Sequence, residues 1–374
     1  MIRKDRLIRL ARELIRIDSQ NPPGNESRIA DFVVRYLAGC GVRCRRVAYK
    51  PHRANIIASL GSRRCGKELL ITPHLDTVPA GGSWREDPFG ARIRAGRLYG
   101  LGATDCKVNL ACSLEVIRSL VEDKVKLPYT LTLAATADEE SGSGLGLIPL
   151  LDKGVLKPDA AVVLDADARD IIVSQKGLIH LKVRITGTRA HGAYPWLGHS
   201  AISDAVRVLR DIRPSAGRVR RSRYLRPPTV NIGTIRGGDK VNVVADWCEF
   251  ELDFRFLPGE SSRVLLAELK KTIAKTTKRF TIEVEGIQQP YEIAEGHPLV
   301  SGLQRAMRAC GVRPVVCGSE GATVITFFQH KRIPAVATGF GVRGCAHKAD
   351  EYLRISDLYK GACILERFLS DYRF

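Results

Sequence analysis

Residues suited to metal binding follow four apolar segments of the sequence. Each segment is followed within nine residues by imidazole or carboxylate side chains: His74 and Asp76 after 68–72, Asp138, Glu139 and Glu140 after 129–136, Asp165 after 160–164, and His347 after 333–338. Imidazole nitrogen and carboxylate oxygen together form a ligand set that suits Zn²⁺. Taken singly these signals are weak, because a lone His after a strand is more often a hydrogen-bonded core or surface residue. The metal site therefore depends on a fold that brings the four segment ends together.

The four segments have the pattern of strands in one α/β sheet. Apolar strands are expected at 55–60, 68–72, 129–136 and 160–164, and they alternate with helical patterns at the N-terminus, 27–38 and 109–122. Such alternation is typical of a mixed, mainly parallel sheet with helices on both faces. In open α/β sheets ligands bind beyond the carboxyl ends of the strands, so distant residues converge at one edge. After Pro298 the pattern returns with a helix, the strand 333–338 and a terminal helix.

A different pattern occupies the middle of the chain. Strands that alternate apolar and polar residues are combined with two helices in the order βαββαβ: 178–186, helix 201–212, 229–235, 247–256, helix 262–277 and 280–284. This order is typical of a ferredoxin-like α+β domain. We therefore predict an α/β domain formed by residues 1–177 and 291–374, interrupted by a smaller α+β domain at 178–290.

A series of short blocks accompanies these elements. In chain order they are His74-Leu-Asp76, 84–90 with 96–100 and 102–107, 137–144, 187–195 with Gly198, 241–244, 253–255, and 346–352. In this order and spacing they resemble the M20 metallohydrolases, a family that includes acetylornithine deacetylase, succinyl-diaminopimelate desuccinylase, aminoacylase and glutamate carboxypeptidase. The resemblance extends from about residue 10 to the end of the chain and implies a metal-dependent hydrolase of linear amides. The N-terminal segment alternates charged and apolar residues at helical spacing and lacks the continuous apolar core of a signal peptide, so a cytoplasmic protein is expected.

The resemblance also implies a role for each matched residue. Asp105 would bridge two Zn²⁺ ions, with His74 and Asp165 on one ion and Glu140 and His347 on the other. Co²⁺ or Mn²⁺ are possible substitutes. Asp76 would support His74 from behind the metal, Glu139 would be the general base, and His191 would stabilise the oxyanion. The substrate's carboxylate and amide would be held by Asn242, Arg255, Gly339 and Gly341.

Partners and substrate are implied at a coarser level. In the family the smaller domain acts as a lid and dimerisation domain, and the residue matching His191 crosses the dimer interface, so a homodimer is expected. Deacylation of acetylornithine-like or succinyl-diaminopimelate-like substrates in amino-acid biosynthesis is the first expectation, with aminoacylase, dipeptidase or carboxypeptidase activity as alternatives.

The sequence departs from the family pattern at a few positions. Asp165 stands where relatives often carry Glu, and Asp167 two residues later is an alternative ligand. The family's Asp-Met-Lys-Gly reads Asp105-Cys-Lys-Val here, and Glu320 lies in an altered late block. None of these changes removes a metal ligand, so a working enzyme is expected.

The composition adds one unusual feature, a net charge of +19 over 374 residues. A basic nucleic-acid-binding protein is the rival interpretation, but the basic residues are spread along the chain and no nucleic-acid motif accompanies them. A positive surface could instead steer an anionic substrate, or a substrate carried on an acidic protein. The ten cysteines form no metal-finger spacing, and no apolar run is long enough to cross a membrane.

Overall fold

The computed structural model describes residues 1–61, 66–166, 168–215 and 221–374. These residues form two compact units. Unit 1 contains residues 1–173, 293–317 and 323–374, and unit 2 contains residues 174–292 and 318–322. No helix among the described residues has the length and apolar character that a membrane span requires.

The main sheet has four parallel strands at its centre. Its order is β1-β2-β6-β3-β7-β15-β8-β13, and β14 pairs with β8. The pairs β6–β3, β3–β7 and β7–β15 are parallel, whereas the outer pairs β1–β2, β2–β6 and β15–β8 are antiparallel. The bounds are β1 (Cys44–Lys50), β2 (Arg53–Leu60), β3 (Glu68–Thr72), β6 (Thr130–Ala135), β7 (Ala160–Leu164), β8 (Asp170–Gln175), β13 (Tyr291–Glu292), β14 (Val315–Ser319) and β15 (Ala335–Thr338).

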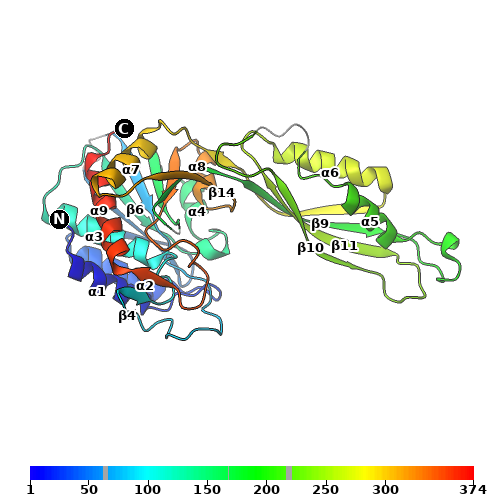
Figure 1. Ribbon diagram of the computed structural model, residues 1–374, viewed down its shortest axis with the longest axis horizontal. Helices are drawn as coiled ribbons and strands as arrows, with labels where there is room; N and C mark the ends of the chain where they lie inside the picture. Colours follow the sequence, from blue (N-terminus) through cyan, green and yellow to red (C-terminus); the bar gives the residue numbers. More distant parts are fainter. Residues whose placement is uncertain (62–65, 167, 216–220) are drawn as a thin grey trace. The chain divides into compact units, whose positions relative to one another are not determined.

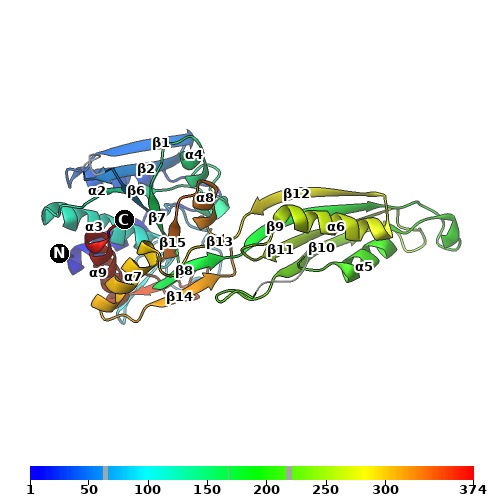
Figure 2. The same cartoon turned by 90° about the horizontal axis from the view of Figure 1, so that it is seen from above.

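Helices cover both faces of this sheet. Figures 1 and 2 show α3, α7 and α9 on one side of the central strands and α4 and α8 on the other. The helices are α1 (Lys4–Ile15), α2 (Ser27–Ala38), α3 (Lys107–Glu122), α4 (Leu147–Asp152), α7 (Pro298–Ala309), α8 (Ile325–His330) and α9 (Ile355–Asp371). Because α3 lies between α1 and α9, nearly all its residues are buried, which explains its weak amphipathic pattern. β6 and β7 are buried at every position, as expected for central parallel strands.

Unit 2 has the ferredoxin-like topology that the sequence predicts. Its antiparallel sheet has the order β10-β11-β9-β12. The chain order is β9 (Gly177–Thr186), α5 (Ala201–Asp211), β10 (Thr229–Gly237), β11 (Trp247–Phe256), α6 (Ser262–Thr276) and β12 (Phe280–Gln288). Alternate residues of β11 are buried, and Phe250, Leu252 and Phe254 pack with Leu265 and Leu269 of α6. The predicted fold class is therefore confirmed.

Some elements were not predicted. They include the strands β1, β8 and β14 and a small sheet of the order β16-β5-β4, formed by β4 (Arg92–Arg94), β5 (Arg97–Tyr99) and β16 (Tyr352–Arg354). β1 and β4 are exposed or half-buried and rich in Arg, so they lack the apolar alternation that identifies a strand. β10 and β12 extend two and four residues beyond the predicted ends at 235 and 284.

Candidate metal centre

The predicted metal ligands of unit 1 lie together beyond the carboxyl ends of the parallel strands. His74 follows β3, and its backbone forms a bridge with Thr136, which follows β6. Glu139 and Glu140 form a short 3₁₀ turn after β6, and Asp165 directly follows β7. Asp105 lies immediately before α3, next to the buried Cys106. The parallel pairing therefore produces the convergence on which the sequence argument depended.

Asp105 is the central carboxylate of this cluster. Its Oδ1 lies 2.9 Å from Nε2 of His74, and its Oδ2 lies 3.2 Å from Nε2 of His347. Nε2 of His74 is also 3.2 Å from Oδ1 of Asp165, and Nε2 of His347 is 3.2 Å from Oε2 of Glu140. Each oxygen of Asp105 thus belongs to a separate set of donors, one with His74 and Asp165 and one with His347 and Glu140.

The donor atoms are close enough to share cations. His74, Glu139 and Asp165 offer ligand atoms within 4.8 Å of one another, and Asp105, Glu140 and His347 do the same. A third possible group adds Cys106 to His74 and Asp105. However, burial raises the pKa of Cys106 to about 12, and its sulfur already accepts the backbone N–H of His74 at 3.2 Å. Cys106 is therefore a poor ligand, and Asp167 lies outside the described residues.

The charges of the cluster fit bound divalent cations. Four carboxylates converge with two imidazoles, and no Lys or Arg of the described chain forms an ion pair with Asp105, Glu139, Glu140 or Asp165. Burial raises the pKa of Asp165 to about 6, and burial together with the charge of Asp165 raises the pKa of Glu139. Hydrogen bonds with Asp105 and Glu140 raise the pKa of His347 to about 11. This excess of negative charge, with N and O donors, is suited to cations of the Zn²⁺ type.

Asp76 supports the cluster from behind. Nδ1 of His74 lies 3.0 Å from the backbone carbonyl of Asp76 and 3.6 Å from its carboxylate, so the backbone oxygen is the nearer acceptor. The carboxylate of Asp76 instead accepts the backbone N–H groups of Glu139 and Glu140, both at 3.1 Å. Asp76 therefore contacts both the His74 segment and the Glu139–Glu140 turn.

Glu351 holds the segment that presents Asp105. Its carboxylate accepts the backbone N–H groups of Gly102, Thr104 and Asp105 at 2.9, 2.6 and 2.9 Å. The side chain is almost fully buried, and this burial raises its pKa to about 7. Glu351 lies in one of the sequence blocks that match the family, but its role was not predicted. Its position four residues after His347 was the available signal.

The two predicted substrate-binding glycines lie near this edge of the sheet. Gly339 and Gly341 follow β15 and are buried. A Cβ atom at position 339 would lie 1.7 Å from the carbonyl oxygen of Ala166, so only glycine fits there. Gly339 therefore has a packing function whether or not it also contacts a substrate.

Three predicted site residues belong to unit 2, at opposite ends of its sheet. The exposed His191 and Asn242 lie together, since His191 bridges Val243 and the N–H of Gly192 donates to the carbonyl of Asn242 at 2.8 Å. Arg255 pairs in register with Leu178 at the start of β9, whereas His191 lies beyond the end of that strand. At a rise of about 3.3 Å per residue along β9, Arg255 and His191 are separated by a distance on the order of 25–30 Å. Arg255 forms an ion pair with Asp253 at 2.8 Å.

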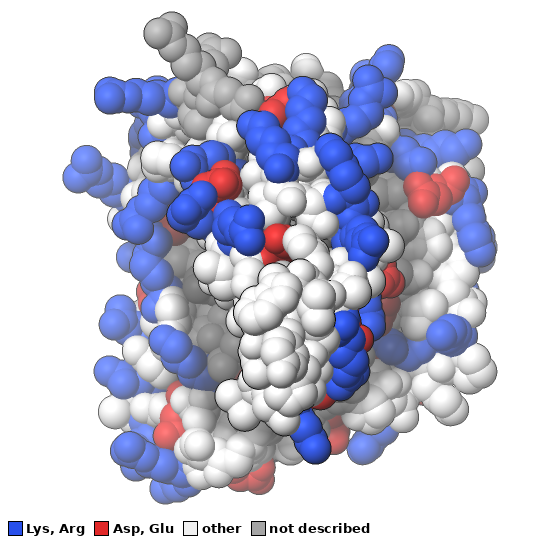
Figure 3. Space-filling view, turned by 90° about the vertical axis from the view of Figure 1, so that its right-hand side faces the viewer, with Lys and Arg blue, Asp and Glu red and all other residues white. Residues whose placement is uncertain are grey.

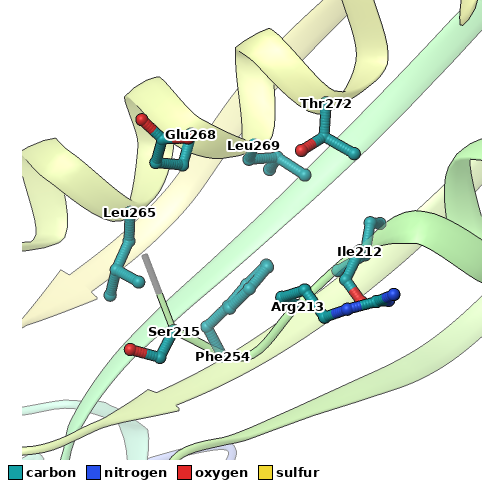
Figure 4. A pocket seen from close by; sticks show the side chains of 8 residues that line it. All are labelled: Ile212, Arg213, Ser215, Phe254, Leu265, Glu268, Leu269 and Thr272. Carbon is teal, nitrogen blue, oxygen red and sulfur yellow. The ribbon is translucent and has the colours of Figure 1, made fainter. Parts of the chain in front are cut away.

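Unit 2 also contains a small cavity of about 120 Å³ between α5 and α6 (Figure 4). Its lining combines apolar, hydroxyl and charged side chains: Ile212, Arg213, Ser215, Phe254, Leu265, Glu268, Leu269 and Thr272. None of these is a predicted site residue, and the cavity offers no cluster of metal ligands.

Comparison with known proteins identifies the family. The family model described as peptidase family M20/M25/M40 matches residues 70–371. The chain belongs to this family. It is 30% identical to acetylornithine deacetylase of Proteus mirabilis (strain HI4320), over 90% of this chain and 87% of that protein. It is also 30% identical to acetylornithine deacetylase of Vibrio atlanticus (strain LGP32), over 94% of this chain and 93% of that protein.

Solved structures of other M20 proteins share the fold of this M20 chain. Aminopeptidase PepT from Bacillus cereus ATCC 10987 aligns with a TM-score of 0.84 and 25% identity, over 99% of this chain and 98% of that one. An M20 family metallo-carboxypeptidase from Sulfolobus solfataricus aligns with a TM-score of 0.80 and 21% identity, over 97% and 98%. The resemblance inferred from the sequence is therefore confirmed, and the protein is a metallohydrolase enzyme of this family.

Proposed function

We propose that this protein is a dinuclear zinc hydrolase that cleaves the amide bond of an N-acyl amino acid or a small peptide. The observation that carries the proposal is the division of Asp105 between two donor sets, with His74 on one oxygen and His347 on the other. A carboxylate shared in this way is suited to bridge two cations. One ion would be held by His74, Asp105 and Asp165, and the other by Asp105, Glu140 and His347.

The protein residues divide the work of amide hydrolysis. Two bound cations would supply Lewis acidity toward the carbonyl group and lower the pKa of water at the site. Glu139 would take a proton from the attacking water and return it to the leaving amine. Its raised pKa favours this role, since a general base works best when its pKa is near the working pH. Asp76 would hold His74 and the Glu139–Glu140 turn in place.

The arrangement of unit 2 favours a homodimer. His191 would stabilise the oxyanion, and Asn242 and Arg255 would bind the substrate's amide and carboxylate, together with Gly339 and Gly341. Arg255 is at the other end of the sheet from His191 and Asn242, so one copy of unit 2 cannot place all three around one substrate. Two copies can do so, if His191 and Asn242 serve the site of the partner subunit.

The relatives support two candidate substrate classes. The two acetylornithine deacetylases make an N-acyl amino acid the first candidate, with acetylornithine or a succinylated diamino acid as examples. A small peptide is the second candidate, because the PepT structure aligns over almost the whole chain. Both are linear amides, and the same catalytic groups serve either.

The test is a substrate panel measured with and without metal. Purified protein treated with a chelator is expected to lose activity and to regain it with Zn²⁺ or Co²⁺, with close to two equivalents bound. The panel contains acetylornithine, succinyl-diaminopimelate, acetylmethionine and simple dipeptides and tripeptides. A protein that binds no divalent metal, or hydrolyses every compound equally with and without it, would contradict the proposal.

A further inference from the structure

Behind the metal-ligand cluster, unit 1 contains a second group of buried polar side chains, which we call the Arg53 cluster. It consists of Asn21, Glu26, Arg53, Asp76 and Asp138. The side chains of Arg53 and Asp138 are 11% and 8% exposed, and Glu26 and Asp76 are fully buried. The cluster buries three carboxylates with one guanidinium, two of them in contact with it, and burying these charges is costly, so the arrangement needs a reason.

Arg53 connects two different parts of unit 1. Its Nε donates to Glu26 at 2.8 Å, and its Nη2 donates to Oδ1 of Asp138 at 2.6 Å. Asp138 is the residue immediately before Glu139, and its backbone has the left-handed conformation, with φ of 66°. Its other carboxylate oxygen accepts the N–H of Leu145 at 2.9 Å, so both oxygens of Asp138 are fixed.

Asn21 connects Asp138 to Asp76. Its amide nitrogen donates to Oδ2 of Asp76 at 2.9 Å and lies 3.3 Å from Oδ1 of Asp138. Asp76 in turn accepts the N–H groups of Glu139 and Glu140. Asn21 is therefore linked by hydrogen bonds through Asp76 to the backbone N–H groups of the turn, whereas Arg53 fixes Asp138, the residue that immediately precedes the turn in the chain.

The loop that carries Asn21 is itself fixed to the His74 segment. The N–H of Asn21 donates to the carbonyl of Thr77 at 2.8 Å, and the hydroxyl of Ser19 donates to the carbonyl of Leu75 at 2.8 Å. Gly24 in this loop has φ of 79°, and a Cβ there would lie 2.3 Å from the Arg53 guanidinium. Glycine thus allows the loop to pass close to the Arg53 side chain. Segment 19–26 therefore contacts both Arg53 and the His74 segment and does more than reverse the direction of the chain.

The backbone contacts matter because the side chain of Glu139 has no hydrogen-bond partner among the described residues. Its direction therefore depends on the backbone of the turn that carries it. We propose that Arg53 and Asn21 are positioning residues, which hold the Glu139–Glu140 turn in the orientation needed for proton transfer. Neither residue is within hydrogen-bond distance of a proposed metal ligand side chain, and this role rests on the proposed function of Glu139 as the base.

The experiment compares Arg53→Ala and Asn21→Ala with wild type, all at saturating metal. Because a misplacement of about 1 Å can cost about 100-fold in rate, kcat should fall by about 10- to 100-fold in both variants. KM and the metal content at saturation should stay as in wild type, since neither residue contacts substrate or metal. Arg118→Met is the control Arg variant, because Arg118 contacts Glu122 and Tyr36 and none of the residues of the Arg53 cluster or the metal-ligand cluster, so kcat should stay unchanged.

Chemical rescue separates positioning from general stability. Guanidinium at low, non-denaturing concentration should restore part of the kcat of Arg53→Ala in a saturable manner, because the ion fits the vacated place between Glu26 and Asp138. Urea at the same concentration should not do so, and guanidinium should not restore Glu139→Gln. If Arg53→Ala does not fold, Asn21→Ala still tests the positioning role, because it removes only a neutral amide and leaves no charged group unpaired.

The outcomes distinguish this inference from the proposed function. Wild-type kcat in Asn21→Ala or in Arg53→Ala at full metal occupancy overturns the positioning role, provided that Glu139→Gln is inactive. A fall in kcat of Arg53→Ala that guanidinium does not reverse also overturns it. Wild-type turnover in Glu139→Gln would instead refute the proposed general base, whatever the Arg53 variants show.

Discussion

At the scale of single residues, the adjacent Glu139 and Glu140 have different proposed roles because their side chains contact different groups. Oε2 of Glu140 is 3.2 Å from Nε2 of His347, and its Oε1 is 3.2 Å from the N–H of Val78, so both oxygens have partners. The side chain of Glu139 has none among the described residues and lies with His74 and Asp165. One glutamate is thus arranged as a ligand and the other as a free base.

This difference gives a prediction for Glu139→Gln. The amide cannot accept a proton from water, so turnover should fall by about 10²- to 10⁴-fold, the usual contribution of a general base. Metal content, measured by elemental analysis, should stay near two equivalents. Glu140→Gln is the matched control and should lose one equivalent instead. Equal metal loss in both variants would show that Glu139 is a ligand.

At this scale the sequence predicted the convergence of ligands but not what holds them. His74, Asp105, Glu140, Asp165 and His347 could be proposed because their spacing and order match a known family. The supporting residues could not. Asn21 looks like part of a turn, and Arg53 looks like one surface Arg among many, until the fold brings both to Asp138.

At the scale of elements, the segment 102–105 depends on Glu351 from a distant part of the chain. Three backbone N–H groups of this segment donate to one buried carboxylate. Since the segment connects the small sheet to α3 and presents Asp105, the direction of the central ligand depends on these bonds. The sequence could not show this, because the interaction joins residues about 250 positions apart.

Glu351→Gln should therefore weaken metal binding. The Gln side chain keeps one acceptor oxygen and has an NH₂ donor in place of the other. This donor would face a backbone N–H group and could not accept its hydrogen bond. Loss of such a supporting contact typically costs about 10- to 100-fold in metal affinity. Competition with a chromophoric chelator measures the change. Asp350→Asn is the control, because Asp350 accepts the backbone N–H groups of Arg85 and Glu86, away from the 102–105 segment, and this variant should leave the metal affinity unchanged.

The packing of α1 on α3 includes a charge pair that should respond to acid. Hydrogen bonds from Arg118 and Arg6 lower the pKa of Glu122 from 4.5 to about 2. A carboxyl group whose pKa is lower in the folded state stabilises the fold above its unfolded pKa. That contribution is lost as the pH falls from about 4.5 to about 2.

Glu122→Gln should therefore reduce the free energy of unfolding at pH 6 and reduce it less at pH 3, where the unfolded-state carboxyl group is already protonated and part of this contribution is lost. Denaturant unfolding of wild type and variant at both pH values gives the comparison. Lys271→Met, which breaks an exposed pair with Glu268, should show a small difference at both pH values. An effect of Glu122→Gln that does not depend on pH would contradict this account.

At the scale of the whole molecule, the charge of +19 is spread widely rather than gathered in one site. On the face drawn in Figure 3, Lys and Arg side chains are spread over the upper part and along the margins, with few acidic residues between them, and uncharged residues form the centre. A field of this kind raises the encounter rate of anionic substrates and depends on ionic strength. It does not determine the fold, which explains why composition alone could not separate an enzyme from a nucleic-acid-binding protein.

Salt should therefore lower kcat/KM selectively. For substrates with net negative charge, including one attached to an acidic protein, kcat/KM should fall as NaCl is raised from low concentration to well above 0.1 M. The Debye length is about 10 Å at 0.1 M and shortens further above it, so the attraction of the surface for these substrates is screened. For neutral dipeptides it should change little. Equal salt dependence for both substrate types would show that the surface charge does not steer substrates.

The proposed sharing of sites between two copies can be tested with two inactive variants. His191→Ala lacks the residue donated to the partner's site, and Glu139→Gln lacks the base of its own site. Mixing equal amounts after dissociation should place one intact site in each mixed dimer, so activity should recover to about one quarter of wild type. Each variant alone, and a mixture of His191→Ala with His191→Ala/Glu139→Gln, should stay inactive. If the first mixture also stays inactive while size-exclusion chromatography of tagged chains shows mixed dimers, His191 acts within its own subunit and the shared site is refuted.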